Sequence, residues 1–478
     1  MRMQREAVSE SISPIIAEFI AAIDVPERVR RRATYLFLDA IGVALAASTF
    51  PFARSTADAL GCIEGGRFPV IGLPTRLSMR DAGLVTGMLI HGIDFDDTSV
   101  AARIHPSGFC LPATLTLGVQ LGSSGKDALT AYIAGLECAL RIGAAAAGGF
   151  QRRGFYATGL MACFGGVFTA SRLLGLSVSQ IVSAQGVAYG MAAGNRAFSA
   201  EMAWTKRFGS GWGAASGITA AMLAKGGFMG PSVPYEGKFG LYAVHSDNPK
   251  PISIADLASV VDRLGENWVV EDIAVKPVPA CYFNIPLIDA ALRIYNEHKP
   301  CIADIESVRV LLPEAALDSV CEPAASKRRP TDSYVAQFSA YYLTASCLVR
   351  GKFDLDDVLP DALMNPSVLA LADKVVYEFD PRTTFPKYYS GAVIVRMRDG
   401  TTFEAREDVD RGSAERPLSL LEIEQKFVNN ASRVFPLVRV NQIRDMILDI
   451  DRLKYIGDLA ELLAVTASAP AWQSPRPD

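Results

Sequence analysis

The stretch PERVRRRATYLFLDAIGVALAA, residues 26–47, decides the fold class of this 478-residue chain. Pro26 followed by Glu27 is a helix-start signal, because proline is well tolerated in the first turn. Apolar side chains then recur at helical spacing, at Val29, Ala33, Leu36, Phe37, Ala40, Ile41 and Ala44. The spacing predicts a helix with one long buried face.

More helices are predicted along the first 265 residues. Ser78-Met-Arg-Asp81 is a capping signal for a helix that ends near His91-Gly92, and Ser177-Val-Ser-Gln180 is a capping box. Small residues such as Gly213 and Gly217 predict closely packed helices, since each interior glycine costs about 1 kcal/mol that packing must offset. The other candidates are Pro112–Leu121, Lys126–Ile142, Thr158–Leu174, Ser177–Ala193 and about 211–225.

The pattern changes near residue 266, where short β-rich runs begin. Asp399-Gly400 is a strong hairpin signal between two of them. The runs are Trp268–Val275, Ser307–Leu312, Lys374–Phe379, Ala392–Arg398 and Thr401–Ala405, and helical segments are predicted at Ile285–Glu297, Tyr334–Val349, Ser419–Val428 and Val440–Leu463. We therefore predict a mainly α protein. Its large all-helical domain spans 1–265 and is completed by 410–465, a smaller α+β domain spans 266–409, and 466–478 is a tail.

Composition excludes several classes of protein. The chain has 47 basic and 51 acidic residues, a net charge of −4 and a pI of 5.8, which argues against a nucleic-acid partner. Half of the residues are apolar, which excludes disorder as the dominant state. Neither a membrane span nor an export signal is apparent, so we expect a cytoplasmic protein. Eight scattered cysteines and four histidines show no metal-ligand spacing, so no metal site is predicted.

The densest polar cluster is HGIDFDDT, residues 91–98, followed by RIHPS, residues 103–107. A carboxylate beside a histidine can orient the imidazole and tune its pKa for proton transfer. The alternative is a helix end followed by a solvated acidic loop. The aspartates of this loop, Asp94, Asp96 and Asp97, could also bind Mg²⁺ weakly.

Two lysines stand in distinctive contexts. Lys206 precedes a glycine-rich helix, and a helix N-terminus with an adjacent lysine attracts carboxylates or phosphates. Lys276 is followed by Pro-Val-Pro, which stiffens the loop. The alternatives are a surface lysine without a special role and a hinge between domains.

Taken together, the sequence resembles the MmgE/PrpD family. The matching segments are Asp94-Phe-Asp-Asp-Thr98 with His105-Pro-Ser, Gly154-Phe-Tyr-Ala-Thr-Gly159, Lys206, Lys276 with Pro279-Ala-Cys281, and Gln337-Phe-Ser339, in the family's order from about residue 12 to 465. The resemblance implies a large helical domain, a smaller α+β lid domain, a homodimer, and chemistry on small carboxylates without metal or cofactor. The low-polarity Gly/Ala-rich helical half also favours a homodimer.

The resemblance implies that Asp94, Thr98, His105, Lys206 and Lys276 line the active site. We assign His105 as the general acid/base, Asp94 as its partner or orienter and Thr98 as a hydrogen-bond donor. The residues expected to bind substrate are Lys206, Lys276, Tyr156, Tyr282, Tyr342 and Arg103. We interpret His91 as a structural residue at a helix end, and His245 and His298 as surface residues.

The chain departs from the family at two positions that matter for charge. Tyr156 stands where many members have histidine and Tyr282 where many have arginine. Fewer cations predict a substrate with one or two carboxylates. The predicted function is a cofactor-independent lyase, either a dehydratase or a decarboxylase. The alternatives are an epimerase or isomerase that uses the same carbanion chemistry, and a carboxylate-binding relative without catalysis.

Overall fold

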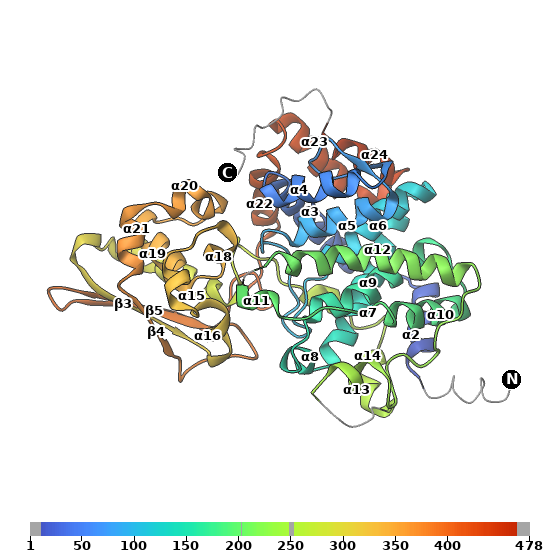
Figure 1. The fold of residues 1–478 in the computed structure, drawn as a ribbon, viewed down its shortest axis with the longest axis horizontal. Helices are drawn as coiled ribbons and strands as arrows, with labels where there is room; N and C mark the ends of the chain where they lie inside the picture. Colours follow the sequence, from blue (N-terminus) through green and yellow to red (C-terminus); the bar gives the residue numbers. More distant parts are fainter. Residues whose placement is uncertain (1–10, 202, 248–252, 466–478) are drawn as a thin grey trace. The chain divides into compact units, whose positions relative to one another are not determined.

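The structure, a computed structural model, describes residues 11–201, 203–247 and 253–465 (Figure 1). The chain divides into two compact units. Residues 93–95 and 274–418 form the second unit, and the other described residues form the helical unit. The protein is 58% helical and 9% strand, which confirms a mainly α fold with a smaller α+β part. The predicted tail, 466–478, lies outside the described residues.

The helical unit contains one small two-stranded antiparallel sheet among its helices. Its elements are α2 (Ser13–Ala22), α3 (Glu27–Ala47), α4 (Pro51–Gly61), β1 (Gly65–Pro69), β2 (Arg76–Leu77), α5 (Met79–His91), α6 (Ser107–Leu121), α7 (Gly125–Ala145), α8 (Gly149–Arg152), α9 (Ala157–Leu173), α10 (Val178–Tyr189), α11 (Phe198–Glu201), α12 (Thr205–Lys225), α13 (Leu241–His245), α14 (Ala258–Val261), α22 (Leu420–Ala431), α23 (Leu437–Leu448) and α24 (Ile456–Leu462).

The predicted capping signals are confirmed. Ser78 accepts a hydrogen bond from the Asp81 N–H at the start of α5, and Ser177 and Gln180 form the predicted capping box. Two helices begin earlier than predicted, α6 at Ser107 and α12 at Thr205. The single helix predicted at Val440–Leu463 is wrong, because α23 and α24 are separated by a 3₁₀ turn and a short loop.

Helix α12 packs closely against α9 and α5, which lie beside it in Figure 1. A Cβ atom on Gly87 of α5 would lie 2.6 Å from the Cα of Gly211, and one on Gly217 would lie 2.3 Å from the carbonyl carbon of Gly166 in α9. These backbones therefore approach more closely than any side chain would permit, so the predicted close packing is confirmed.

Helix α7 is long and apolar enough to cross a membrane, as is the sharply bent pair α3–α4 if it is counted as one span. The apolar stretch of α7 is 89% buried within the protein. Its hydrophobic surface is thus used in the core of the helical unit, as expected of a central packing helix.

The predicted strand at Trp268–Val275 is wrong. Val269–Asp272 form a 3₁₀ turn that stays with the helical unit, which continues to Ile273. The turn is anchored to α7, because Val270 N–H donates to Glu137 at 3.2 Å and Arg141 donates to the Asn267 carbonyl at 2.6 Å. Side chains from a distant helix therefore satisfy this backbone in place of a partner strand.

The second unit is built on a four-stranded sheet of order β4-β3-β5-β6. Strands β3 and β4 are parallel and the other pairs antiparallel, and the predicted β5–β6 hairpin is confirmed. Helix α15 packs on β5 and β6 while α19 packs on α15 and β4 (Figure 1). The elements are α15 (Ile285–His298), β3 (Ile305–Leu312), α16 (Glu314–Val320), α17 (Ala324–Arg328), α18 (Ser333–Gln337), α19 (Ala340–Arg350), α20 (Pro360–Leu363), α21 (Pro366–Ala372), β4 (Val375–Phe379), β5 (Gly391–Met397) and β6 (Thr402–Glu407).

One helix predicted in this unit is divided. The segment Tyr334–Val349 forms α18 and α19, with Phe338 and Ser339 between them. The Ser339 hydroxyl accepts a hydrogen bond from Tyr342 N–H at 2.9 Å, so it starts a new helix rather than continuing the first.

Candidate active site

His105 is held in place by the loop between α5 and α6. Ser99 N–H donates to the Ile104 carbonyl at 2.9 Å, which closes a short loop in which Arg103 adopts a positive φ of 55°. Such a backbone is uncommon for a residue with a side chain. The His105 N–H donates to Thr158 Oγ1, in the first turn of α9, at 3.3 Å. The backbone that carries the imidazole is thus fixed from two sides.

The hydrogen bonds of His105 define its tautomer. Its Nδ1 lies 3.0 Å from the Asp97 carbonyl oxygen and 3.0 Å from Thr98 Oγ1. A carbonyl oxygen can only accept, so Nδ1 carries a hydrogen. In the neutral ring Nε2 is then the nitrogen without a hydrogen, and the His105 side chain is 14% exposed.

The carboxylate beside His105 in the helical unit is that of Asp96. Its Oδ1 lies 3.5 Å from His105 Nδ1, and its Oδ2 lies 2.7 Å from Nδ1 of His91, the last residue of α5. The Asp96 and His91 side chains are fully buried, and the two imidazole rings are 4.7 Å apart between centroids. The sequence analysis gave the partner role to Asp94, which belongs to the second unit, and that assignment stays a prediction.

Tyr156 reaches the same group from the start of α9. Its hydroxyl lies 2.5 Å from His91 Nε2, and its ring packs edge-on against Phe198, with centroids 5.1 Å apart. The residue occupies the N-cap position of α9 and is half-buried. Among the predicted residues, the structure therefore brings together His105, Thr98 and Tyr156, through His91 and Asp96.

Asp97 is a buried carboxyl behind this group. It accepts hydrogen bonds from the Ser107 N–H at 3.2 Å and from the Ser107 hydroxyl, which also contacts the Tyr132 hydroxyl. Burial raises the pKa of Asp97 to about 8, the charges of Asp96 and Asp39 act in the same direction, and the Ser107 hydrogen bonds oppose them. Below that pH, the protonated form of Asp97 predominates.

The predicted cation Lys206 is buried in the first turn of α12, with 6% of its surface exposed. Its neighbour Arg207 donates to the Gly92 carbonyl at 2.7 Å and lies 4.2 Å from the centroid of the Phe52 ring. Gly92 directly follows His91, so this contact ties the start of α12 to the end of α5.

In the second unit, Lys276 forms a buried ion pair with Asp94. Its Nζ lies 3.3 Å from the Asp94 carboxylate and 2.9 Å from the Asp94 carbonyl oxygen, and the two side chains are 1% and 2% exposed. Asp94 has a positive φ of 50°. Gln337 donates to the carbonyls of Ile93 and Pro279, at 3.2 Å for Pro279. Residues 93–95 are therefore bound firmly within this unit.

The other two predicted tyrosines make hydrogen bonds inside the second unit. The Tyr282 hydroxyl donates to Asp410 at 2.7 Å, and burial together with that carboxylate raises the pKa of Tyr282 well above its usual value. The Tyr342 hydroxyl donates to the Asp357 carbonyl at 2.8 Å, and burial raises its pKa as well. Their expected roles in substrate binding stay predictions.

One group in the described part of the chain has the composition of a metal site, namely His91, Asp96 and His105, whose ligand atoms lie within 4.8 Å of one another. Two ligands on one tetrahedral zinc ion, each about 2.0–2.1 Å from it, are about 3.3 Å apart. The 2.7 Å between His91 Nδ1 and Asp96 Oδ2 is shorter and fits a direct hydrogen bond. The geometry therefore favours hydrogen bonding over a shared ion.

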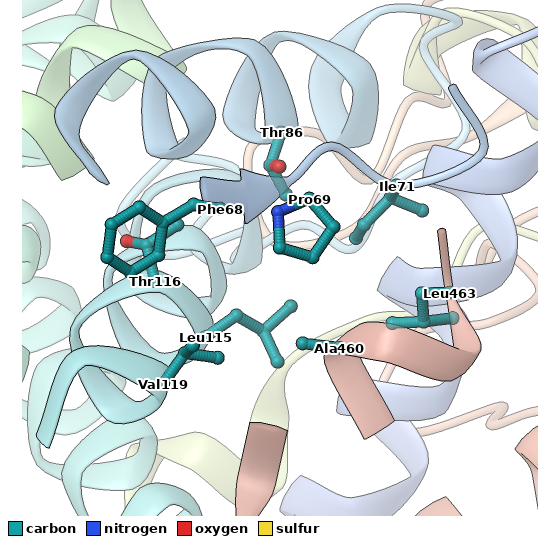
Figure 2. A pocket seen from close by; sticks show the side chains of 9 residues that line it. All are labelled: Phe68, Pro69, Ile71, Thr86, Leu115, Thr116, Val119, Ala460 and Leu463. Carbon is teal, nitrogen blue, oxygen red and sulfur yellow. The ribbon is translucent and has the colours of Figure 1, made fainter. Parts of the chain in front are cut away.

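A small cavity of the helical unit has a different character (Figure 2). None of the nine described residues that line it is charged, and its two threonines contribute its side-chain polar atoms. The Thr116 hydroxyl donates to its own helix, to the Pro112 carbonyl at 2.8 Å. The cavity lacks a charged partner for a carboxylate, so it belongs to the packing of β1, α5, α6 and α24.

Sequence reasoning did not single out the contacts that His91 and Asp96 make with each other, with Tyr156 and with His105. His91 was interpreted as structural because it ends a helix, and Asp96 was one of three neighbouring aspartates. The signal was present in part, since both lie in the polar cluster at 91–98. The third contact, from Tyr156, comes from 65 residues further along and leaves no trace in local spacing.

Three features define the class of protein. They are a large helical unit, a smaller α+β unit and a buried imidazole–carboxylate group suited to proton transfer. The chain belongs to the MmgE/PrpD family, because residues 15–253 match the MmgE/PrpD N-terminal domain and residues 278–452 the C-terminal domain. The predicted resemblance is confirmed.

The chain is similar over most of its length to several characterised proteins. It is 28% identical to the cis-aconitate decarboxylase-like protein oryM of Aspergillus oryzae, over 92% of this chain and 94% of that protein. It is 27% identical to the cis-aconitate decarboxylase of Aspergillus terreus, over 98% and 99%. It is 28% identical to the cis-aconitate decarboxylase of Homo sapiens, over 96% and 95%.

Proposed function

We propose that the protein is a cofactor-independent lyase that acts on a small carboxylate, with His105 transferring the proton. Family membership and the decarboxylase relatives support a carboxylate lyase or decarboxylase. The observation that carries the proton-transfer role is the fully buried Asp96 carboxylate beside both His91 and His105. A buried carboxylate stabilises an imidazolium and so supports acid–base chemistry next to it.

For a decarboxylation, the bond between carbon and the departing carboxylate breaks and leaves its electron pair on carbon. His105 Nε2–H then donates its proton to that carbon, and Asp96 stabilises the imidazolium before transfer. For a dehydration, one group removes a proton from carbon and a second donates a proton to the leaving hydroxide. Neither route consumes an oxidant or a reductant.

The substrate that we propose carries one or two carboxylates. Of the predicted cations, Lys276 neutralises Asp94, whereas Lys206 and Arg103 belong to the helical unit that contains His105. A buried carboxylate without a cation costs several kcal/mol, so a third carboxylate on the substrate would be poorly accommodated. We expect dicarboxylates and monocarboxylates to be turned over faster than cis-aconitate.

The test is product analysis on a panel of hydroxy, unsaturated and amino mono-, di- and tricarboxylates, with cis-aconitate included. Release of CO₂ or formation of an alkene supports the lyase. Uptake of solvent deuterium without net product would instead identify an epimerase, and binding without either would identify a carboxylate-binding protein. A tricarboxylate as the best substrate by kcat/KM would overturn the charge argument.

The protein is further proposed to form a homodimer through the exposed side of α12. Trp204 and Phe208 lie one turn apart and are 50% and 45% exposed, and Met222 at the other end is 46% exposed. Exposed apolar patches of this kind mark interaction surfaces.

Light scattering should give twice the chain mass of 51.3 kDa, and Phe208→Glu should shift the measured mass toward that of one chain. Leu421→Glu, at a residue that is 75% exposed elsewhere in the helical unit, is the control. A wild-type mass near one chain would contradict the dimer.

A further inference from the structure

Three side chains from separate segments form a continuous hydrogen-bonded line in the helical unit. Asp96 Oδ2 lies 2.7 Å from His91 Nδ1, and His91 Nε2 lies 2.5 Å from the Tyr156 hydroxyl. Asp96 comes from the loop after α5, His91 is the last residue of α5, and Tyr156 occupies the N-cap position of α9. The carboxylate and imidazole are fully buried, whereas Tyr156 is half-buried. Of these three side chains, Tyr156 is thus the one that is partly exposed.

We propose that Tyr156 is a second acid–base group of the site, with His91 and Asp96 as positioning residues that take up and return its proton. The proposal rests on the proposed function for its substrate, because only a reacting carboxylate gives that proton a destination. The sequence analysis assigned Tyr156 to substrate binding, and His91 to structure.

The order of the contacts dictates the direction of proton movement. The ionised Asp96 accepts from Nδ1–H of His91, so Nε2 of the neutral ring accepts the phenol proton. Acting as a base, Tyr156 passes its proton to Nε2 and its oxygen removes a proton from the substrate carbon. The resulting imidazolium is balanced by Asp96. Acting as an acid after that step, the phenol donates its proton to the substrate and takes back the proton held on Nε2, so that the His91 imidazole is neutral again. Each step moves one proton and needs no co-reactant.

Asp96 also couples this line to His105. Its other oxygen, Oδ1, is 3.5 Å from His105 Nδ1, and the two imidazole rings are 4.7 Å apart. One carboxylate charge compensates one imidazolium, and two imidazolium ions at this separation repel each other. Protonation of His91 therefore disfavours protonation of His105. The two ends of the group are held in opposite states, one ready to give a proton and the other to take one, as a dehydration requires.

The first experiment needs no substrate. Ultraviolet difference titration of wild type against Tyr156→Phe isolates the phenolate absorbance of Tyr156. The same difference is measured in a His91→Gln background and, in case that variant does not fold, in an Asp96→Asn background. The other titratable and charged groups of this region, His105, Asp97, Asp39 and Arg32, are present in every background, so their contributions cancel in each difference. Tyr455→Phe, at a tyrosine that is 58% exposed in the helical unit, is the control.

If Tyr156, His91 and Asp96 form a proton relay, Tyr156 ionises at a lower pH in the wild-type background than in either variant background, because an imidazolium stabilises the phenolate. An identical ionisation in all backgrounds would overturn the relay.

The second experiment uses the best carboxylate of the panel. Tyr156→Phe should lower kcat by about 10²-fold, the usual contribution of a positioned acid or base, with little change in KM. His91→Gln should lower kcat and move the alkaline limb of the pH–rate profile to higher pH.

The outcomes separate the two proposals. If the ionisation shift is observed but no carboxylate is turned over, the relay stands and the proposed function fails. If carboxylates are turned over and Tyr156→Phe retains full kcat, the proposed function stands and the relay fails.

Discussion

Asp94 and Asp96 are two residues apart and both buried, yet their side chains contact different kinds of partner. Asp94 belongs to the second unit and pairs with the ammonium of Lys276. Asp96 belongs to the helical unit and lies beside two imidazoles. A lysine keeps its charge near neutral pH, whereas a histidine gains or loses one there. The comparison teaches that the partner decides whether a buried carboxylate stabilises a fold or supports proton transfer.

The largest expected effect is on stability and concerns the Asp94–Lys276 pair. Lys276→Met leaves a buried carboxylate without its cation and should lower the free energy of unfolding by about 3–5 kcal/mol. Lys352→Met, which removes the lysine of the exposed 2.9 Å pair with Asp354, is the matched control and should cost no more than about 1 kcal/mol. Urea unfolding measures both. Equal losses would show that burial of the Asp94 pair contributes nothing special.

The next effect is on catalysis and concerns the imidazoles. His105→Gln should lower kcat by about 10²-fold or more, since it removes a positioned acid–base group, and should leave the unfolding transition nearly unchanged. His298→Gln, at an exposed histidine that stacks on Phe403, is the control. Steady-state kinetics on the best panel substrate make the comparison. An unaltered kcat in His105→Gln would move proton transfer to another residue.

Asp97 gives an effect that is smaller per pH unit; its hydrogen-bond partners are the hydroxyl and the backbone N–H of Ser107. The native protein holds this proton up to about pH 8, whereas the unfolded chain releases it near pH 4. The stability that this group contributes is therefore complete below about pH 4 and is lost as the pH rises through about 8, by at most about 1.4 kcal/mol per pH unit.

Asp97→Asn should flatten the pH dependence of unfolding across that range, whereas Asp58→Asn, at a side chain that is 61% exposed, should not. Thermal unfolding in a series of buffers measures the slopes. If wild type and Asp97→Asn have the same slope, Asp97 is ionised in the native protein.

The last prediction is that removing metal ions has no effect on kcat. If the group of His91, Asp96 and His105 works through hydrogen bonds, exhaustive chelation with EDTA leaves kcat unchanged. Abolition of activity, with recovery on adding back a divalent ion, would instead assign these side chains to a metal and would remove the distinction drawn between Asp96 and Asp94.

Local signals in the sequence predict much of the fold. The apolar spacing at residues 26–47 predicts α3, Ser78 predicts the start of α5, and Asp399-Gly400 predicts the β5–β6 hairpin. These succeed because the decisive interactions lie within one element or one turn. Trp268–Val275 misleads because its apolar residues pack against α7 without a partner strand, and neighbouring sequence does not report that contact.

The candidate site divides in the same way. His105 and Thr98 could be predicted because they lie in one loop, and the family motif marks them. Which of three neighbouring aspartates accompanies the histidine could not be predicted. Asp94, which has a positive φ, belongs to the second unit and pairs with Lys276, whereas Asp96 belongs to the helical unit. That outcome depends on backbone geometry set by distant segments.

The most direct test of the central claim is the turnover of Asp96→Asn against wild type on the best carboxylate of the panel. The proposed lyase function predicts release of CO₂ or an alkene by wild type. The buried carboxylate beside two imidazoles predicts a fall in kcat of about 10²-fold in Asp96→Asn, with the circular dichroism spectrum and KM little changed. No turnover by wild type on any carboxylate, or full kcat in Asp96→Asn, would contradict the account.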